Sequence, residues 1–253
     1  MSIDKFISFA ALHKPGTPII LFNAWDAGSA RVIADAGAAA IATGSWSVAA
    51  AHGAIDAEAL PLDLALANAA RIVEAVPLPV TIDFEGGYAV DPGAVGANVV
   101  ALAATGAIGC NFEDQVIGTP TRTLHAIDAQ IARITAMRAA AGTAFFINAR
   151  TDIFLQAPAG THDKAKADAA IDRAHAYADA GASGFFVPGL VDLTLLERIC
   201  RASPLPVNFM AFPGAPSAAQ VAATGIARIS HGPGPYRLAM KAVSDAARAV
   251  FGG

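Results

Sequence analysis

Short apolar segments alternate with longer helical segments along the whole chain. Eight of the apolar segments end in glycine or a polar residue, which is typical of strands buried on both faces of a parallel sheet. Segments with helical periodicity lie between them, such as Leu60–Val76 and Asp163–Ala180, and Tyr236–Phe251 follows the last one. The eight expected strands are Ile19–Trp25, Ala39–Ser45, Pro79–Glu85, Ala107–Asp114, Ala144–Arg150, Gly184–Gly189, Leu205–Met210 and Ala227–His231.

This alternation predicts an α/β protein with a parallel sheet. Eight strand–helix units predict a single (β/α)8 TIM barrel over residues 1–253, a usual length for that fold. The alternative is a doubly wound open sheet, which would call for a G-x-G-x-x-G turn after an early strand. The stretch after the first strand, Asp26-Ala27-Gly28-Ser29-Ala30, has no such turn, so the barrel is favoured.

Composition narrows the class of protein. The net charge of −4 and a pI near 5.8 argue against a nucleic-acid surface. Mean hydropathy is positive, at +0.48, but charge-free runs such as Ala36–Ile55 are interrupted by polar residues and glycine, so we expect no membrane segment. The N-terminal residues Met1–Pro15 lack a secretory pattern, and Cys110 and Cys200 are too few for a disulfide framework. We therefore expect a cytoplasmic protein.

Acidic residues gather where barrel enzymes hold their chemistry, at the carboxyl ends of the strands. Asp83 and Glu85 are two positions apart, so both should face the lumen, and Glu113 ends the next strand. Three carboxylates this close raise one another's pKa unless a cation joins them. Oxygen ligands without histidine favour Mg²⁺. The alternative is that these acids cap helices or form a structural ion network with Arg150.

Other polar residues suggest how a ligand could be held. Arg150 ends the fifth strand and could bind an anionic group with its planar fork, or could merely neutralise Glu113 or Asp152. The predicted loop Thr43–Ser47 offers backbone N–H groups to a second anionic group. Asn208, at the end of the seventh strand, is a further candidate for substrate contact.

Two cofactor classes are disfavoured. None of the five lysines lies at a strand end, which argues against Schiff-base or pyridoxal phosphate chemistry. The six histidines show no zinc-ligand spacing.

Four motifs stand at strand ends, namely Asn23-Ala24-Trp25-Asp26-Ala27-Gly28-Ser29-Ala30-Arg31, Asp83-Phe84-Glu85-Gly86-Gly87-Tyr88, Asn111-Phe112-Glu113-Asp114 and Asn148-Ala149-Arg150-Thr151-Asp152. Together they make the chain resemble the isocitrate lyase/phosphoenolpyruvate mutase superfamily over nearly its whole length. The resemblance implies that Asp83 binds Mg²⁺ directly and that Asp56, Glu85 and Glu113 hold its waters. It also implies that a substrate carboxylate rests on the backbone of Gly44, Ser45 and Trp46, with Arg150 at the far end.

The chain departs from both main branches of that superfamily. The lyase branch carries an acid/base cysteine in the loop after the fourth strand, where this chain has Thr121, and a threonine hydroxyl is no proton donor near neutral pH. The mutase branch places a lysine on this loop and a histidine after the sixth strand. Here Gln115–Thr123 has no lysine, and the sixth strand ends Phe186-Val187-Pro188-Gly189.

The main hypothesis is therefore a Mg²⁺-dependent lyase or decarboxylase that acts on a small 2-oxo acid or a 2-hydroxy di-acid through a metal-stabilised enolate. In this reading Arg150, Glu113 and Asp56 serve catalysis. The alternatives are a P–C bond enzyme of the phosphoenolpyruvate mutase or phosphonopyruvate hydrolase type, and a 2-oxo acid binding protein without turnover. The resemblance further implies a homo-oligomer, a dimer or a tetramer.

Overall fold

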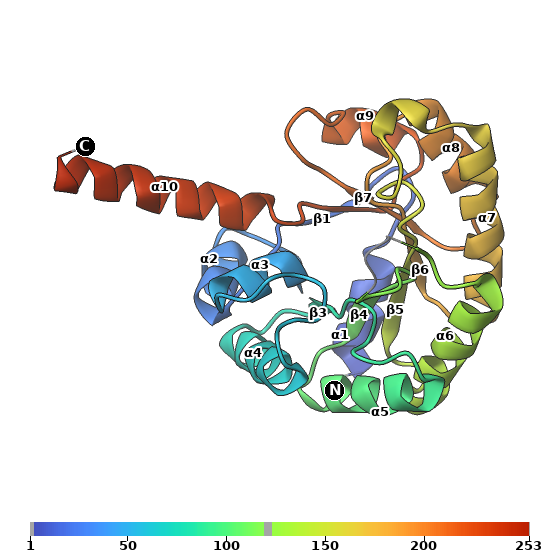
Figure 1. Ribbon diagram of the computed structural model, residues 1–253, viewed down its shortest axis with the longest axis horizontal. Helices are drawn as coiled ribbons and strands as arrows, with labels where there is room; N and C mark the ends of the chain where they lie inside the picture. Colours follow the sequence, from blue (N-terminus) through green and yellow to red (C-terminus); the bar gives the residue numbers. More distant parts are fainter. Residues whose placement is uncertain (1–2, 119–122, 253) are drawn as a thin grey trace.

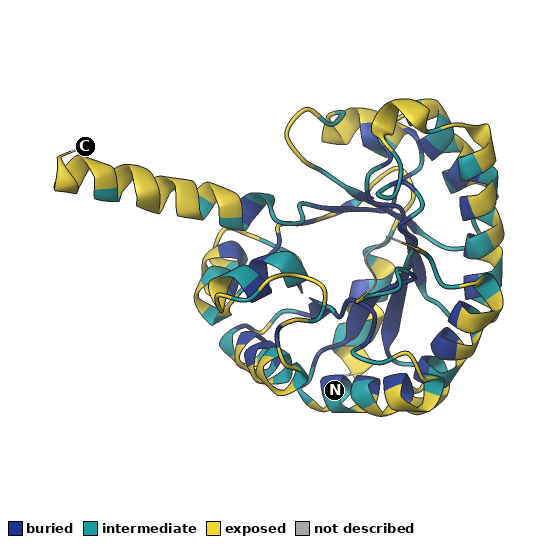
Figure 2. Cartoon of the chain, in the orientation of Figure 1, coloured by how far each residue is buried: buried dark blue, intermediate teal, exposed yellow. Residues whose placement is uncertain are grey.

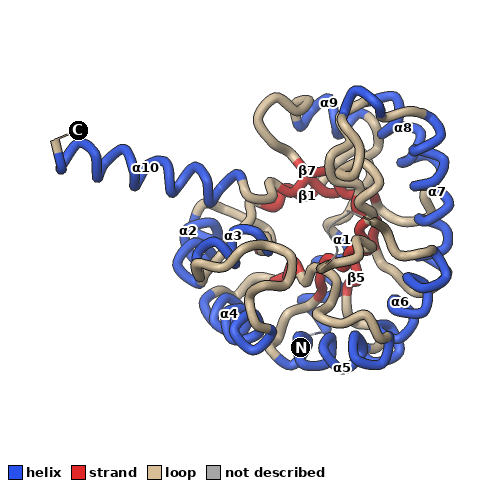
Figure 3. Tube along the Cα trace, viewed as in Figure 1, coloured by secondary structure: helices blue, strands red, loops and turns tan. Residues whose placement is uncertain are grey.

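The computed structural model describes residues 3–118 and 123–252 and shows the predicted barrel. Eight parallel strands pair in the order β1-β8-β7-β6-β5-β4-β3-β2. Between β1 and β2 the ring is closed by one parallel bridge, Ala24 with Thr43, where Ala24 N–H donates to the Ala42 carbonyl at 2.8 Å. Figure 3 shows the ring of strands inside its shell of helices. The strands are β1 (Ile19–Leu21), β2 (Ile41–Ala42), β3 (Val80–Asp83), β4 (Gly109–Glu113), β5 (Phe146–Arg150), β6 (Gly184–Phe186), β7 (Val207–Met210) and β8 (Arg228–Ser230).

All eight strands occur where the pattern predicted them, but most are shorter than expected. Several polar residues that we placed in strands lie just beyond them, among them Asn23, Glu85 and His231. The backbone turns away from its neighbours there to enter the loops, so the ladder of hydrogen bonds stops earlier than the apolar pattern does. These loops carry much of the candidate site.

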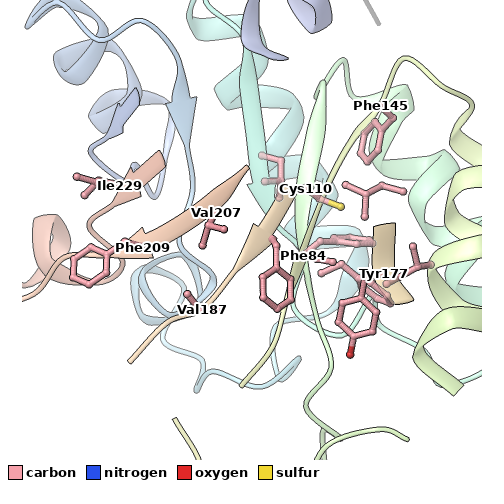
Figure 4. Close-up of a cluster of buried hydrophobic side chains, with 14 of the residues drawn as sticks. Phe84, Cys110, Phe145, Tyr177, Val187, Val207, Phe209 and Ile229 are labelled. Atoms are coloured by element: carbon pink, nitrogen blue, oxygen red, sulfur yellow. The ribbon is translucent and has the colours of Figure 1, made fainter. Parts of the chain in front are cut away.

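Seven helices pack around the outside of the strands (Figure 1). Aromatic and aliphatic side chains fill the layer between strands and helices, and Figure 4 shows Phe84, Tyr177 and Phe209 among them. The seven helices are α2 (Ala27–Asp35), α4 (Leu62–Ala75), α5 (Pro92–Ala104), α6 (Ile127–Ala141), α7 (Lys164–Asp179), α8 (Leu193–Ala202) and α9 (Ala218–Ala223). The three helical ranges named from the sequence agree with α4, α7 and the last helix within two residues at each end. A helical turn, η1 (Ala159–Thr161), follows β5.

The pattern analysis did not foresee α1 (Ile3–Ala11), which covers the amino-terminal end of the barrel. Its Phe9 is fully buried against side chains that lie in, or directly before, strands β1, β2, β4 and β5. These are Ile19, Leu21, Ala40, Ala42, Ile108 and Phe146. The lumen is thus closed at this end, and the opposite end is left for a ligand.

The last helix, α10 (Gly234–Phe251), projects away from the barrel instead of packing beside β1 (Figures 1 and 2). Leu238 is 65% exposed and Val243 is 62% exposed. The outer face of β1 is correspondingly uncovered, with Ile20 45% and Phe22 41% exposed. No helix in the described part of the chain is long and apolar enough to cross a membrane.

Candidate active site

A cavity of about 170 Å³ opens at the carboxyl ends of the strands. It brings together six of the predicted site residues, from four separate strand ends and loops. Its other side is largely apolar, formed in part by Leu155, Phe186, Pro188 and Met210. The predicted residues that line it are Gly44, Ser45, Trp46, Asp56, Asp83 and Arg150.

Asp83 ends β3 and is fixed by neighbours on both sides. Ser45 donates to Asp83 Oδ2 from its backbone N–H at 2.9 Å and from its hydroxyl at 3.0 Å. Asn111, opposite Asp83 in the β3–β4 register, donates to Oδ1 at 3.3 Å. The Asp83 backbone N–H donates to the Thr43 hydroxyl at 2.9 Å. Asp83 therefore reaches the cavity with its orientation already set.

The segment after β2 differs from the expected loop. It is the start of α3 (Ser45–Ala51), with Gly44 at the N-cap position. Glycine and serine directly after a strand are as typical of a turn as of a helix start, so the sequence pattern did not predict a helix at Gly44 and Ser45. The Ser45 N–H faces Asp83 rather than an external anion, so a ligand carboxylate on Gly44, Ser45 and Trp46 remains a prediction.

Glu85 and Glu113 lie together behind the cavity wall. Glu85 follows β3 in a left-handed conformation with φ of 49°, so strand alternation does not place it, contrary to our expectation. Instead the Glu113 N–H donates to the Glu85 carbonyl at 2.9 Å and joins the two residues. Each residue is buried, at 5% exposure. Both acids are thus near Asp83, but they do not line the cavity.

The carboxylates interact strongly with one another. Burial, then Asp56 and Asp83, raises the pKa of Glu85 to about 8, against a hydrogen bond from the Glu58 amide. Burial also raises the pKa of Glu113 well above its usual range, although Arg150 opposes the shift. Burial and Asp83 raise the pKa of Asp56. A cation would relieve this shared repulsion.

These groups fit a magnesium ion bound in one particular way. Within residues 3–118 and 123–252, no three His, Cys, Asp or Glu side chains are arranged to bind a metal ion directly. A single direct carboxylate such as Asp83 is compatible with Mg²⁺, because this ion usually keeps several waters and takes one or two carboxylates directly.

Arg150 forms ion pairs with two carboxylates, and this agrees with the structural role that we left open. Its Nη1 lies 2.7 Å from Glu113 Oε2, its Nε lies 2.6 Å from Asp152 Oδ1, and its Nη2 donates to Asp152 Oδ2 at 2.9 Å. These acids raise the pKa of Arg150 well above its usual value. Arg150 also lines the cavity, so binding a ligand remains compatible with these pairs.

Other polar strand-end residues have structural partners. Asn208 is buried beneath the cavity, donates to the Ser230 hydroxyl at 3.3 Å, and does not line the cavity wall. Asp26 caps α2. Asp114 accepts from Arg173 at 3.0 Å and from Tyr177 at 2.8 Å. The role of Asn208 toward a substrate is still a prediction.

Sequence reasoning missed Glu58, which contacts Glu85 through its backbone N–H at 2.7 Å. It lies in an irregular stretch without periodicity, so no sequence signal marked it. The supporting role of Asn111 could have been found, because it stands in one of the four motifs. Thr121, the residue in the place of the lyase cysteine, lies outside the described residues.

The family model for phosphoenolpyruvate phosphomutase matches residues 9–251. The chain belongs to the isocitrate lyase/phosphoenolpyruvate mutase superfamily. Among curated superfamily relatives, 2-methylisocitrate lyase of Salmonella typhimurium (strain LT2) is 30% identical over 78% of this chain and 70% of its own length. Oxaloacetate decarboxylase of Ectopseudomonas mendocina (strain ymp) is 29% identical over 89% of this chain and 77% of its own.

A solved superfamily structure is more similar still. It is a candidate phosphonomutase of Burkholderia cenocepacia J2315, 50% identical, with a TM-score of 0.93 over 99% of both chains. Proteins similar to this chain thus carry the names of lyases, decarboxylases and enzymes of phosphonate chemistry.

Proposed function

We propose that this protein is a Mg²⁺-dependent lyase or decarboxylase of a small 2-oxo acid or 2-hydroxy di-acid. The observation that carries the proposal is the arrangement around Asp83. One oriented carboxylate lines a small cavity, and Asp56, Glu85 and Glu113 lie close enough to shift one another's pKa. The relatives named as lyase and decarboxylase support the reaction class.

In the proposed site Asp83 would hold the metal directly, and Asp56, Glu85 and Glu113 would hold its waters. Bound Mg²⁺ would supply a Lewis acid that polarises a carbonyl oxygen and stabilises negative charge developing on it. Ser45 and Asn111 keep Asp83 in one orientation, so little reorganisation is needed when a ligand arrives.

The cavity wall opposite Asp83 suggests the size and polarity of the substrate. A volume of about 170 Å³ suits an acid of a few carbon atoms and is below the usual range for drug-sized ligands. Leu155, Phe186 and Met210 exclude water from that side and would contact a carbon chain. Arg150 is the charged group there that can contact a second anionic group.

Phosphonate chemistry is the second candidate, because the family model and the 50% identical relative both point to it. A phosphonate carries two negative charges near neutral pH and needs several donors or cations around it. In this cavity the residues at the end of β6 are Phe186 and Pro188, which offer neither. That wall favours carbon–carbon chemistry.

A thermal-shift screen with added Mg²⁺ tests the proposal. Oxaloacetate, 2-oxobutyrate, 2-methylisocitrate, phosphonopyruvate and oxalate would each be compared with and without the metal, because a ligand that binds the folded state raises Tm. Proton and phosphorus NMR would then follow each stabilising acid for turnover. Mg²⁺-dependent C–C cleavage or CO₂ release supports the proposal. Turnover of phosphonopyruvate alone supports the second candidate, and binding without turnover of any acid would make the protein a binder.

A further inference from the structure

Two loops at the cavity contain every left-handed non-glycine residue in the described part of the chain. Ala57 and Glu58 have φ of 73° and 57°, and Glu85 and Tyr88 have φ of 49° and 57°. Such backbone is disfavoured for residues with a side chain and persists only where surrounding contacts hold it. The four positions lie in just two segments, Asp56–Glu58 after α3 and Glu85–Tyr88 after β3.

The two segments are joined by reciprocal bonds between carboxylates and backbone amides. The Glu58 N–H donates to Glu85 Oε2 at 2.7 Å, and the Tyr88 N–H donates to Glu58 Oε1 at 2.7 Å. Each glutamate therefore fixes the backbone of the other's loop.

Side chains from helices α5 and α6 support Glu58 and the turn after β3. Arg133, buried on α6, attracts the Glu58 carboxylate and donates to the carbonyls of Gly86 and Ala89. Asn98 on α5 donates to the Gly87 carbonyl at 2.9 Å. The turn after β3 is thus anchored to two helices, and Glu58 extends that anchor to the loop that carries Asp56.

We propose that Glu58 is a positioning residue, which clasps the Asp56–Glu58 loop to the Glu85–Tyr88 turn and so holds Asp56 at the cavity and Glu85 behind its wall. Asp56 lies two residues before Glu58 in an exposed loop with no helix or strand to fix it. Glu85 receives a direct hydrogen bond from the Glu58 backbone. This inference rests on the proposed function only in assigning Asp56 and Glu85 to the metal.

The test compares Glu58→Ala, which removes the carboxylate, with Glu58→Gln, which keeps an acceptor for the Tyr88 N–H. Mg²⁺ affinity is measured by calorimetry on the full chain. Removing a group that orients metal-binding residues typically weakens metal affinity about 10–100-fold, so we expect a loss in that range for Glu58→Ala and recovery of most of it in Glu58→Gln. Ile199→Val, a buried change on α8 far from the loops, controls for a general loss of stability and should keep the wild-type affinity.

Hydrogen exchange without metal tests the clasp itself. The amide of Tyr88 should exchange faster in Glu58→Ala than in Glu58→Gln or Ile199→Val. Unchanged exchange at Tyr88, or unchanged Mg²⁺ affinity in Glu58→Ala, would overturn the proposal. So would an equal loss of affinity in Ile199→Val. If the wild type bound no Mg²⁺, the proposed function would fail, and the exchange comparison would still decide whether Glu58 holds the loop.

Discussion

The Arg150 guanidinium donates two hydrogen bonds to Asp152 and forms an ion pair with Glu113. Arg150 also lines the cavity. The same residue therefore fixes an acid of the proposed metal site and marks the place where a second anionic group could bind. Its two roles can be separated by comparing ligands that do and do not carry that group.

We predict that oxaloacetate binds the Mg²⁺-loaded protein better than pyruvate, because its second carboxylate can reach Arg150. A charge-assisted pair shielded from water contributes roughly 1.5–3 kcal/mol, or about 10–150-fold in affinity. Arg150→Lys keeps the charge but loses the fork, so most of this preference should disappear. Dissociation constants for both acids on both proteins measure it. Equal wild-type affinities would mean that Arg150 is purely structural.

Metal affinity should also depend on pH. Glu85 has a pKa raised to about 8 by burial and its acidic neighbours, so it binds a proton more tightly than a free glutamate does. A cation must displace that proton, and the apparent Mg²⁺ affinity should therefore rise as pH rises through about 8 and fall below it. Calorimetric titrations at pH 6.5, 7.5 and 8.5 check this direction. A Mg²⁺ affinity independent of pH over that range would contradict the raised pKa of Glu85 or its role near the metal.

At the scale of elements, the strands and most of the helices could be predicted because their patterns are strong. Strand alternation with helices placed all eight strands, and four motifs placed Asp83, Glu113 and Arg150 at their ends. The sequence did not reveal α1, which lies before the first strand and so outside the repeating strand–helix units, or the clasp at Glu58, which depends on left-handed backbone. Left-handed backbone at such residues is set by tertiary contacts, so it cannot be predicted from hydrophobic periodicity.

The residues after α1 give the protein a specific sensitivity to acid. His13 follows this helix, donates from Nδ1 to the Phe9 carbonyl at 2.9 Å, and stacks on Phe146. Burial and then Arg228 lower its pKa from 6.5 to about 3. The unfolded chain therefore takes up a proton that the folded protein does not, and stability is full above pH 6.5 and falls as pH decreases toward 3.

We predict that between pH 7.5 and pH 5 the wild type loses about 2 kcal/mol more free energy of unfolding than His13→Gln does. Glutamine at position 13 does not titrate, whereas every other titratable group is the same in both proteins. The variant is therefore the reference for the wild type at each pH. Urea unfolding at the two pH values provides the measurement. Identical pH dependence of the two proteins would show that His13 titrates in the folded protein as it does in the unfolded chain.

For the whole molecule, the face that α10 leaves uncovered is an open apolar surface. A hollow of about 460 Å³ lies over β1 and α2, lined by Ile20, Phe22, Val32 and Ile33. The projecting helix exposes apolar side chains of its own, Leu238 and Val243 among them. Apolar surface on both parts is typical of a protein that associates with copies of itself.

We therefore predict a homo-oligomer, a dimer or a tetramer, in which α10 of one copy covers the hollow of another. Leu238→Glu with Val243→Glu should lower the oligomeric state by placing charges in the contact. Ser244→Glu, also on α10 and exposed, is the control for added charge. Light scattering at micromolar concentration measures the mass. A monomeric wild type would refute the prediction.

The central claim is that Asp83 binds Mg²⁺ for enolate chemistry at this cavity, and one titration tests it most directly. Mg²⁺ would be titrated calorimetrically into wild type, Asp83→Ala and Asp172→Ala in the presence of oxalate, which resembles the enolate of a 2-oxo acid. Asp172 is an exposed acid on α7 and leaves the cavity untouched. We expect binding by wild type and Asp172→Ala, and no detectable binding by Asp83→Ala with its circular dichroism unchanged. Undiminished Mg²⁺ affinity in Asp83→Ala would contradict the account.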